Sequence, residues 1–513
     1  MTATKIGNYR WTICSLLFFA TTINYLDRQV LSLTWKDFLV PEFHWTDTDY
    51  GNITSIFSIA YAISMLLAGR FVDWMDTKKG FLWAIFIWSI GACLHAYCGI
   101  ATAGMLNGDW FAGFEGAKES IATVDNISKI VSISVMLFIF ARIVLALGEA
   151  GNFPAAIKAT AEYFPKKDRA LATSIFNAGA TVGALAAPLT IPDIARAYGW
   201  EMAFIVIGAL GFVWMGFWVF IYKKPEVHPR ISKAELEYIQ QDIVKHDPVL
   251  EPVIAAKKKM SFAQCFKYKQ TLAFAFGKFM TDGVWWFYLF WTPAYLSSVY
   301  GLKSDNPTAK LMIFVLYGIT LFSIIGGWLP KYFVDKKKLN PYEGRMKAML
   351  LFAFLPLLAL LAQPLGGYSP WFPVIIIGIA GAAHQSWSAN IFSTVGDMFP
   401  KSAVATVTGI GGMAGGIGSY LINKGSGVLF DFARKTWTTV NGQSLADVKP
   451  EWVKDDFKLT DSMLTDLHKT GAEVVNGVNN GYMIIFSICA VAYLIGWIVM
   501  KSLVPKMKVI HEE

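Results

Sequence analysis

The stretch Thr21–Leu33, TTINYLDRQVLSL, places an acid and a base side by side within a long apolar segment. That segment runs from about residue 11 to residue 33, which is long and apolar enough for a membrane-spanning helix. Asp27 and Arg28 lie inside it, where each charge costs roughly 2.5–3.5 kcal/mol. Charged side chains at this depth normally face a cavity or a charged partner, so both residues are candidates for a functional site.

The composition is typical of a chain that crosses a membrane many times. Of its 513 residues, 55% are hydrophobic and 16% are charged, whereas about a quarter of the residues of soluble domains are charged. Hydropathy predicts twelve membrane-spanning helices. The apolar windows lie approximately at residues 11–33, 49–71, 80–103, 130–156, 170–192, 201–222, 270–298, 309–330, 347–364, 371–394, 403–429 and 480–502.

The basic residues predict how the chain is oriented in its membrane. The net charge is +8, and dense basic clusters at residues 166–169, 257–259 and 336–338 fall in loops on the same side as the N-terminus. The positive-inside rule assigns that side to the cytoplasm. With an even number of spans, both termini of this multi-pass protein are then cytoplasmic, and we expect a monomer in the lipid bilayer of the cell (inner) membrane.

Two further classes of partner are not expected. The basic clusters lie in separate loops and form no single stripe, so nucleic acid is a poor candidate. The five cysteines have no metal-ligand spacing, so no metal site is predicted.

An internal repeat predicts the domain organisation. Residues 162–183 read EYFPKKDRALATSIFNAGATVG and residues 397–416 read DMFPKSAVATVTGIGGMAGG, each leading into a span rich in glycine and alanine. The same turn at the same place in each half predicts two parallel six-helix repeats in an all-α membrane protein. We expect an N-terminal bundle over 1–222, a cytoplasmic linker over 223–268, and a C-terminal bundle over 269–513 with an external insert at about 431–479.

The fourth predicted span carries a second pair of opposite charges. Arg142 and Glu149 are seven residues apart, which is two helical turns, so both project from one face. That face must line the protein interior, because charges facing lipid are costly. Pro154 follows closely and predicts a kink or local unwinding beside the carboxylate.

The seventh span carries Lys278 and Asp282, which are four residues apart and can pair across one turn. The alternative is that Lys278 lies near the helix end and extends its ammonium group to the membrane surface. Trp286 belongs to an aromatic run that forms either an interface belt or a platform for a sugar ring. Pro293 is expected to break this helix.

Two other polar stretches are candidate functional elements. In the tenth span, Gln385, Ser388 and Asn390 suit either the binding of hydroxyl groups or helix packing, whereas a satisfied core histidine is the favoured role of His384. Residues 69–73, GRFVD, are expected to form a short loop between the second and third spans. Gly69 and Asp73 there are either ordinary loop residues or part of a gate.

These residues suggest a chemistry. The guanidinium fork of Arg28 can hold a carboxylate bidentately, which suits an anionic solute. Asp27 and Glu149 are candidate proton carriers, because a proton on one acid lets the loaded site reorient without an uncompensated negative charge. The alternative is that Asp27–Arg28 and Arg142–Glu149 are static ion pairs. The first interpretation predicts a transporter driven by a proton gradient, without another cofactor.

The motifs together resemble the anion:cation symporter branch of the major facilitator superfamily. They are NYLDR at 24–28, the 69–73 segment, AR at 141–142, GEAGNFP at 148–154, EYFP at 162–165 and SKAELEYI at 232–239. AHQ at 383–385 with Ser388, and Phe176-Asn177 with Gly179, are most similar to bacterial hexuronate transporters. Trp74 and Asp76 depart from the family pattern after Asp73, so the gate is expected to be built differently.

The resemblance implies the superfamily fold and proton-driven import of galacturonate or glucuronate. It implies that Glu149 and Asp27 handle protons, that Arg142 tunes the nearby acid, and that Arg28 holds the carboxylate. Tyr25, Tyr61 and Asn177 would contribute to the substrate site.

Other substrates and other classes of protein remain alternatives. Because Asp27 is common in hexonate carriers, a hexonate, glucarate or another organic anion is an alternative substrate. An enzyme is not expected, since no loop carries an exposed nucleophile, metal cluster or acid pair. A non-transporting sensor is a further alternative, but such proteins usually carry an added signalling domain.

Overall fold

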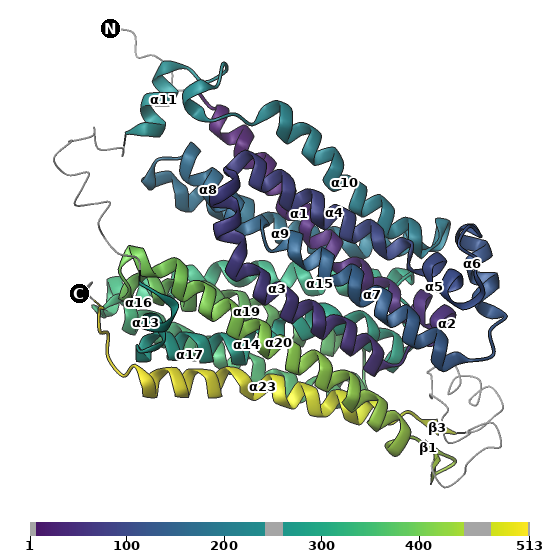
Figure 1. Ribbon diagram of the computed structural model, residues 1–513. Helices are drawn as coiled ribbons and strands as arrows, with labels where there is room; N and C mark the ends of the chain where they lie inside the picture. The colour runs from purple at the N-terminus through teal and green to yellow at the C-terminus, as the bar shows by residue number, and fades with distance from the viewer. Residues whose placement is uncertain (1–6, 242–259, 446–472, 511–513) are drawn as a thin grey trace.

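The computed structural model describes residues 7–241, 260–445 and 473–510. Long helices run side by side through the molecule and form two bundles of six spanning segments (Figure 1). The predicted all-α fold with twelve spans is confirmed. The predicted limits at residues 222 and 268 lie beside the end of the sixth segment and the start of the seventh, and they stay predictions.

The first bundle holds segments one to six, and four of its six segments are single continuous helices in their spanning part. The other two, the third and the fourth, are each built from two consecutive helices. The segments are α1 (Tyr9–Thr34), which continues as the π-helix η1 (Trp35–Leu39) and α2 (Val40–Phe43), then α3 (Asp47–Met75), α4 (Thr77–Ala96) with α5 (Cys98–Asn107), α7 (Ile127–Glu149) with α8 (Asn152–Tyr163), α9 (Lys166–Tyr198) and α10 (Trp200–Ile221).

The second bundle holds segments seven to twelve, two of which pass through short 3-10 stretches. The segments are α14 (Lys269–Tyr300), α15 (Pro307–Thr320) through η3 (Leu321–Ile324) into α16 (Ile325–Lys337), α17 (Pro341–Phe354) through η4 (Leu355–Leu361) into α18 (Ala362–Gly366), α19 (Trp371–Met398), α20 (Lys401–Trp437) and α23 (Val478–Leu503).

Short elements connect the segments or cap their ends. The strands form an antiparallel sheet in the order β2-β1-β3, in which Thr439 of β1 faces Ser444 and Val475. The short elements are α6 (Gly113–Ala122), η2 (Pro225–Val227), α11 (Lys233–Gln240), α13 (Phe262–Phe266), β1 (Thr439–Val440), β2 (Gln443–Ser444) and β3 (Val474–Val475).

Eight of the spanning segments are long and apolar enough to cross a membrane by length and composition alone, within the described residues. The other four long helices, α1, α14, α19 and α20, carry more polar residues or more glycine. Three of these four hold charged or amide side chains that the sequence singled out. The candidate site combines side chains of these more polar helices with side chains of the apolar helices α3 and α7.

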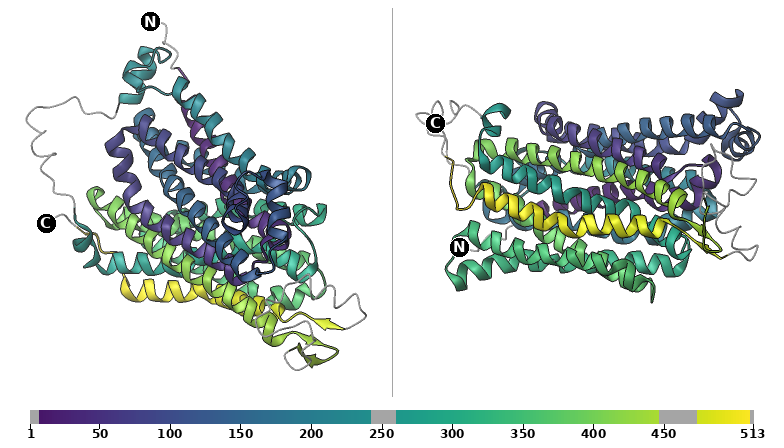
Figure 2. Two further views of the ribbon diagram at one scale, coloured as in Figure 1. Left: turned by 45° about the vertical axis from the view of Figure 1, so that its right-hand side comes forward. Right: turned by 90° about the horizontal axis from the view of Figure 1, so that it is seen from below.

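The two ends of the molecule differ. The start of α1, the end of α23 and α11 lie at one end, here called the terminal end, while α6 and the strands lie at the other, here called the insert end (Figures 1 and 2). Helix α3 packs against α20, α9 against α15 and α1 against α14, and these three contacts join the bundles.

Polar bonds between the bundles gather at the insert end. Asp37 accepts from the Ser297 hydroxyl at 2.6 Å and from the Ser304 backbone N–H at 2.7 Å. Asp47 at the start of α3 pairs with Arg434 of α20. The structure is therefore joined at its insert end.

Contact between α3 and α20 weakens toward the terminal end. A Cβ placed on Gly51 would lie 2.8 Å from the Asn423 carbonyl oxygen, and one on Gly412 would lie 3.8 Å from Met65. A Cβ on Gly69, nearer the terminal end, would meet nothing within 4 Å. The contact between α3 and α20 is thus closest in the half nearer the insert end.

Glycines of the internal repeat allow close packing of helices. A Cβ on Gly183 of α9 would lie 2.5 Å from the Thr22 carbonyl oxygen of α1. A Cβ on Gly416 of α20 would overlap Ala62 of α3. Both positions need a residue without a side chain, because the backbones approach too closely for one.

The predicted interruptions have mixed outcomes. The fourth segment breaks between Glu149 and Asn152, as the position of Pro154 predicted. The expected break at Pro293 is wrong, since α14 continues to Tyr300 and packs on both sides against α20 and α23. Residues 69–73 are not a loop either, because their apolar side chains continue α3 to Met75.

The linker begins with a capped helix. The Ser232 hydroxyl accepts the Glu235 backbone N–H, and α11 follows for eight residues. The Glu235 carboxylate binds Arg10 of α1, with 3.2 Å between Oε1 and Nη1, which ties the linker to the first bundle. Residues 242–259 of the predicted linker and most of the predicted insert at 431–479 lie outside the described residues.

One buried acid lies beyond the first span at the insert end. Glu42 of α2 accepts the Trp200 indole N–H at 2.7 Å, close to Lys118 and Glu201. Burial, partly offset by the Trp200 bond, raises the pKa of Glu42 to about 7. This carboxyl group therefore titrates near neutral pH in the folded protein.

Candidate functional site

An ion pair between two helices forms the centre of the site. Arg28 of α1 donates to Oε2 of Glu149 from Nε at 2.9 Å and from Nη2 at 2.5 Å. Both side chains are buried, and Glu149 is the last residue of α7, beside the helix break.

This pairing differs from the static pairs that the sequence suggested. Asp27 and Arg28 are neighbours in a helix and so point to different faces. The Arg28 side chain instead reaches Glu149. The predicted alternative of Asp27–Arg28 and Arg142–Glu149 ion pairs is therefore wrong, because Arg28 pairs with Glu149.

Aromatic rings from both bundles surround the Arg28 guanidinium group. Its Cζ atom lies 5.1 Å from the ring centre of Tyr25, 4.9 Å from that of Tyr61 and 4.8 Å from that of Trp286. Rings at this distance attract a cation through their negative faces. Trp286 belongs to α14, so the cluster spans the interface between the bundles.

Two more ionisable side chains, Arg142 and Asp27, lie beside this ion pair, and both have buried polar atoms without hydrogen-bond partners in the described residues. Arg142 is 1% exposed, and within the described residues none of its three guanidinium nitrogens has a hydrogen-bond partner. Both carboxylate oxygens of Asp27 lack one as well. Asp27, Glu149 and Arg142 are within electrostatic range of one another. Because buried unpaired charges are costly, this arrangement indicates function rather than stability.

The sequence did not single out Phe57, which connects the two cations. Its ring centre lies 5.8 Å from Cζ of Arg28 and 5.2 Å from Cζ of Arg142. Phe57 precedes Tyr61 by four residues, so the two rings share one face of α3. That spacing was the available signal.

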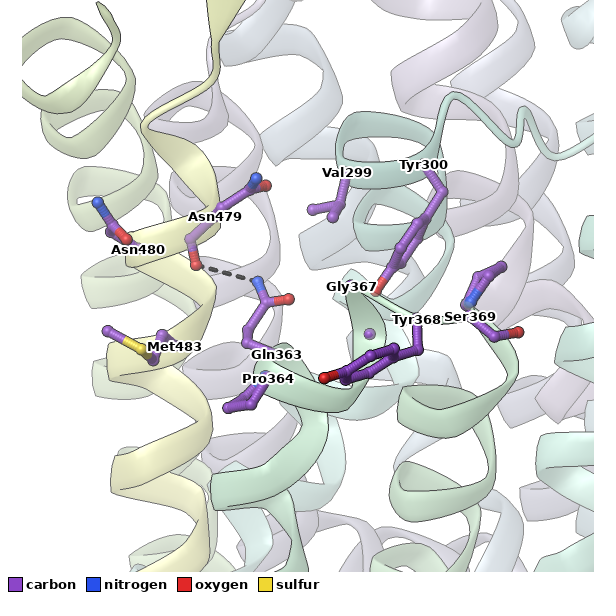
Figure 3. A pocket seen from close by; sticks show the side chains of 12 residues that line it. Val299, Tyr300, Gln363, Pro364, Gly367, Tyr368, Ser369, Asn479, Asn480 and Met483 are labelled. Carbon is purple, nitrogen blue, oxygen red and sulfur yellow. Dashed lines mark hydrogen bonds between the residues drawn. The ribbon is translucent and has the colours of Figure 1, made fainter.

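A cavity of about 550 Å³ lies at the insert end, away from these charges (Figure 3). Tyr300 and Gln363 line it, and the Gln363 amide donates to the Asn479 carbonyl at 3.0 Å. Tyr300 is 14 residues beyond Trp286 on α14, which is about 21 Å along the helix. The lining residues are uncharged, so this cavity lacks a partner for a carboxylate and we place the site at Arg28.

Comparison with known proteins identifies the family. The sequence pattern described as Major Facilitator Superfamily matches residues 17–422. The chain belongs to the Major Facilitator Superfamily. It is a multi-pass membrane transporter and not an enzyme.

Individual relatives agree with this assignment. The chain is 27% identical over 430 residues to the hexuronate transporter of Escherichia coli (strain K12), covering 83% of this chain and 89% of that protein. It is 26% identical over 416 residues to a probable galactarate/D-glucarate transporter of the same organism, covering 80% and 86%. A bacterial homologue of the human lysosomal transporter Spinster, solved inward-facing and unoccupied, shares the fold with a TM-score of 0.67, 16% identity and 98% coverage of both chains.

The other predicted substrate residues are not all gathered at Arg28. Asn177 is exposed on α9, and Gln385 and Ser388 are half-buried on α19. Asn390 is buried and donates to the Gly326 carbonyl of α16 at 2.8 Å, which is the helix-packing alternative. The substrate-binding roles of these residues in the transporter stay predictions.

The tenth span also settles the environment of His384. Its Nδ1 lies 2.8 Å from the Tyr493 hydroxyl, and its ring stacks on Trp285 with 5.4 Å between ring centres. His384 is thus a packed and hydrogen-bonded core residue of the transporter, as the sequence favoured.

The residues predicted to act in gating lie within α3. Gly69 and Asp73 are helical, and the chain turns at Asp76, which has a φ of 66°. Burial alone would raise the pKa of the Asp76 carboxyl group, but the Thr77 N–H and the Lys224 ammonium hold it below its usual value. Nζ of Lys224 is 3.1 Å from Oδ2 of Asp76, so Asp76 makes the ionic contact at this turn. A gating role for Gly69 and Asp73 stays a prediction.

Proposed function

We propose that this transporter is a proton-coupled symporter of sugar acids, with a hexuronate such as galacturonate or glucuronate as its substrate. The observation that carries the proposal is the buried Arg28–Glu149 ion pair at the interface of the bundles. The names of the relatives, a hexuronate and a galactarate/D-glucarate transporter, support a sugar acid.

The ion pair provides a direct mechanism of coupling. Glu149 occupies the guanidinium fork that a substrate carboxylate needs. A proton on Glu149 removes its charge and releases Arg28, and the substrate carboxylate then takes the same donors. One proton and one monoanion leave the net charge of the site unchanged. The loaded carrier can therefore reorient without an uncompensated charge in a medium of low dielectric constant.

Asp27 and Arg142 fit a supporting role in the movement of protons. Asp27 is buried beside the Trp88 side chain and lies within electrostatic range of Glu149. It can exchange protons with Glu149 through water. Arg142 supplies the positive charge that balances Asp27 when Glu149 is protonated.

Trp286 couples substrate binding to closure. It is half-buried and brings a ring of the second bundle to the cation of the first. A sugar ring whose carboxylate is bound by Arg28 can stack on the Trp286 ring. The bound solute then contacts both bundles. Binding would thus favour their approach at the terminal end.

We place the terminal end in the cytoplasm of the cell (inner) membrane, with the transporter acting as a monomer. The basic residues of the sequence support this orientation through the positive-inside rule. Sugar acid and proton then enter together from the insert end.

Uptake into liposomes tests the proposal. The purified transporter would be given labelled galacturonate, glucuronate and galactonate, with and without an imposed pH gradient. We expect accumulation of a hexuronate only with the gradient. Uptake that does not depend on the pH gradient would exclude symport. A preference for galactonate would identify a hexonate carrier, and the absence of any uptake would favour a sensor.

The variant Glu149→Gln tests the role of the ion pair. It keeps the side chain's shape but has no charge to neutralise, so we expect exchange of substrate across the membrane without gradient-driven accumulation. The matched control is Glu115→Gln, an acid whose side chain is 84% exposed on α6. Loss of both exchange and accumulation in Glu149→Gln would instead make Glu149 structural or substrate-binding.

A further inference from the structure

The second bundle holds a buried ion pair that the proposed mechanism does not use. Nζ of Lys278 lies 2.7 Å from Oδ2 of Asp282, one turn further along α14. The Lys278 side chain is 6% exposed and the Asp282 side chain 15%. The sequence left open whether Lys278 extends to the membrane surface, and it does not.

This pair lies on the same face of α14 as Trp286. Positions 278, 282 and 286 are successive turns of one helix face. At a rise of 1.5 Å per residue, Asp282 is about 6 Å from Trp286 along the axis. Because Trp286 contacts Arg28, the ammonium group bound to Asp282 lies roughly one turn from the Arg28 cluster.

The surroundings of the pair come from four other helices. Tyr25 of α1 and Tyr493 of α23 are within electrostatic range of Asp282, and His384 of α19 is within range of Lys278. Helix α20 presents Gly415, where a Cβ would overlap the Asp282 carboxylate. Asp282 is thus approached closely by backbone and faces the α1 side of the interface.

Two features of the pair match those of Arg28 and Glu149. Lys278 lies over an aromatic ring, with Nζ 4.2 Å from the centre of Phe392. Oδ1 of Asp282 is buried and, in the described part of the chain, has no hydrogen-bond partner. Each bundle therefore holds a buried cation that is paired with a carboxylate and lies over an aromatic ring, Arg28 in the first and Lys278 in the second.

We propose that Lys278 is a second carboxylate anchor and that the transporter also carries sugar dicarboxylates, with one carboxylate on Arg28 and the other on Lys278. This inference rests on the proposed function, because it uses Arg28 as the first anchor. A six-carbon diacid has a carboxylate at each end and can bridge two cations that are separated by about a helical turn. A hexuronate has only one carboxylate and leaves Lys278 paired with Asp282.

Charge balance sets the number of protons. A proton on Glu149 releases Arg28 and a proton on Asp282 releases Lys278, so a dianion enters with two protons and a hexuronate with one. Both loaded states have the same net charge as the empty site. One unit of pH gradient then supports about tenfold accumulation of a hexuronate and about a hundredfold accumulation of a dicarboxylate.

The double variant Lys278→Gln with Asp282→Asn tests the second anchor. It removes both charges together, so the site remains neutral and nearly the same shape. Unlabelled galacturonate and galactarate would compete against labelled galacturonate uptake by the reconstituted transporter. We expect the apparent affinity for galactarate to fall tenfold or more, while that for galacturonate changes less than threefold.

The control is Glu115→Gln, which removes an exposed acid from another lysine–acid pair within one helix and leaves Lys118 bound to the buried Glu201. Neither affinity should change there. An equal loss for both acids in the α14 variant would make the pair structural, and no loss would remove Lys278 from the site. Wild type that takes up galacturonate but never binds galactarate would overturn this inference alone, whereas wild type that takes up neither would overturn the proposed function.

The accumulation ratio gives a second measurement. With one unit of pH gradient, we expect galactarate to reach about ten times the accumulation of galacturonate in wild type. Equal accumulation of the two acids would show that Asp282 does not carry a proton.

Discussion

Replacement of Arg434 should open the insert end. Arg434 of α20 and Asp47 of α3 are each 3% exposed and form an ion pair between the bundles. Asp47 is also bound by Lys36, with 3.1 Å between Nζ and Oδ1. The Asp431 carboxylate accepts the backbone N–H groups of Asp47 and Thr48 at 3.1 and 2.7 Å, so the start of α3 is held by α20.

The burial of this ion pair sets the free energy that the closed state loses when Arg434 is replaced. Removal of one partner from a buried ion pair typically costs about 3–5 kcal/mol. In Arg434→Met the Lys36 ammonium still neutralises part of the Asp47 charge, so we expect the lower end of that range. The cost applies only to the state closed at the insert end, because water reaches Asp47 when that end opens. About 3 kcal/mol shifts the equilibrium toward the open state by roughly a hundredfold.

Spin labels can measure this shift. Phe111 and Tyr368 are 101% and 84% exposed, and they lie at the insert end in the first and second bundle. With cysteines at both positions, double electron–electron resonance should show a new population at longer distance in Arg434→Met. Arg434→Lys, which keeps the charge, should keep the wild-type distribution.

A second variant separates opening from damage to the fold. Arg434→Met with Asp47→Asn removes both charges, so the closed population should partly return. An unchanged distance distribution in Arg434→Met, at unchanged thermal stability, would refute the assignment of this pair as the latch of the insert end.

Three other predictions test separate parts of the structure. Gly148→Ala should lower stability by about 1–3 kcal/mol, because a Cβ there would lie 2.6 Å from the Ala84 carbonyl oxygen. Gly69→Ala should be tolerated, because a Cβ there would meet nothing within 4 Å. Thermal unfolding in detergent measures the stability of both variants. Trp286→Leu should raise the KM for uptake about tenfold while accumulation stays gradient-driven, and an unchanged KM would exclude a contact with substrate. Burial raises the pKa of Glu42 from 4.5 to about 7, so the folded state binds this proton more tightly and wild type should lose stability as pH rises from about 4.5 to 7. The melting temperature of Glu42→Gln should not fall over this pH range. If the melting temperatures of wild type and variant changed with pH in parallel, the raised pKa of Glu42 would be contradicted.

Much of the fold was predictable because its signals are local. Apolar windows of about twenty residues, a Gly/Ala repeat and one proline gave the spans, their grouping and the break beside Glu149. Pro293 shows the limit of this reasoning. A proline removes one backbone hydrogen bond, but packing of α14 between α20 and α23 keeps the helix continuous.

The identity of the site residues was more accessible than their pairing. A charge inside a span is costly wherever it points, so Asp27, Arg28 and Glu149 were apparent from sequence. Which cation meets which acid depends on how α1 and α7 rotate against each other, and that rotation is set by packing over the whole bundle. Phe57 and Lys278 became informative for the same reason, since their neighbours come from helices distant in sequence.

The contact between the bundles at Arg28 bears on the proposed coupling. Arg28 and Glu149 belong to one bundle, whereas the ring of Trp286 from the opposite bundle lies 4.8 Å from the guanidinium carbon. Under the proposed function, reorientation of the bundles would move the ring away from the cation but leave the carboxylate in place, because α1 and α7 belong to one bundle. The surroundings of the Arg28–Glu149 pair would then differ between the two orientations, so a proton or a substrate that competes for this pair would bias their equilibrium.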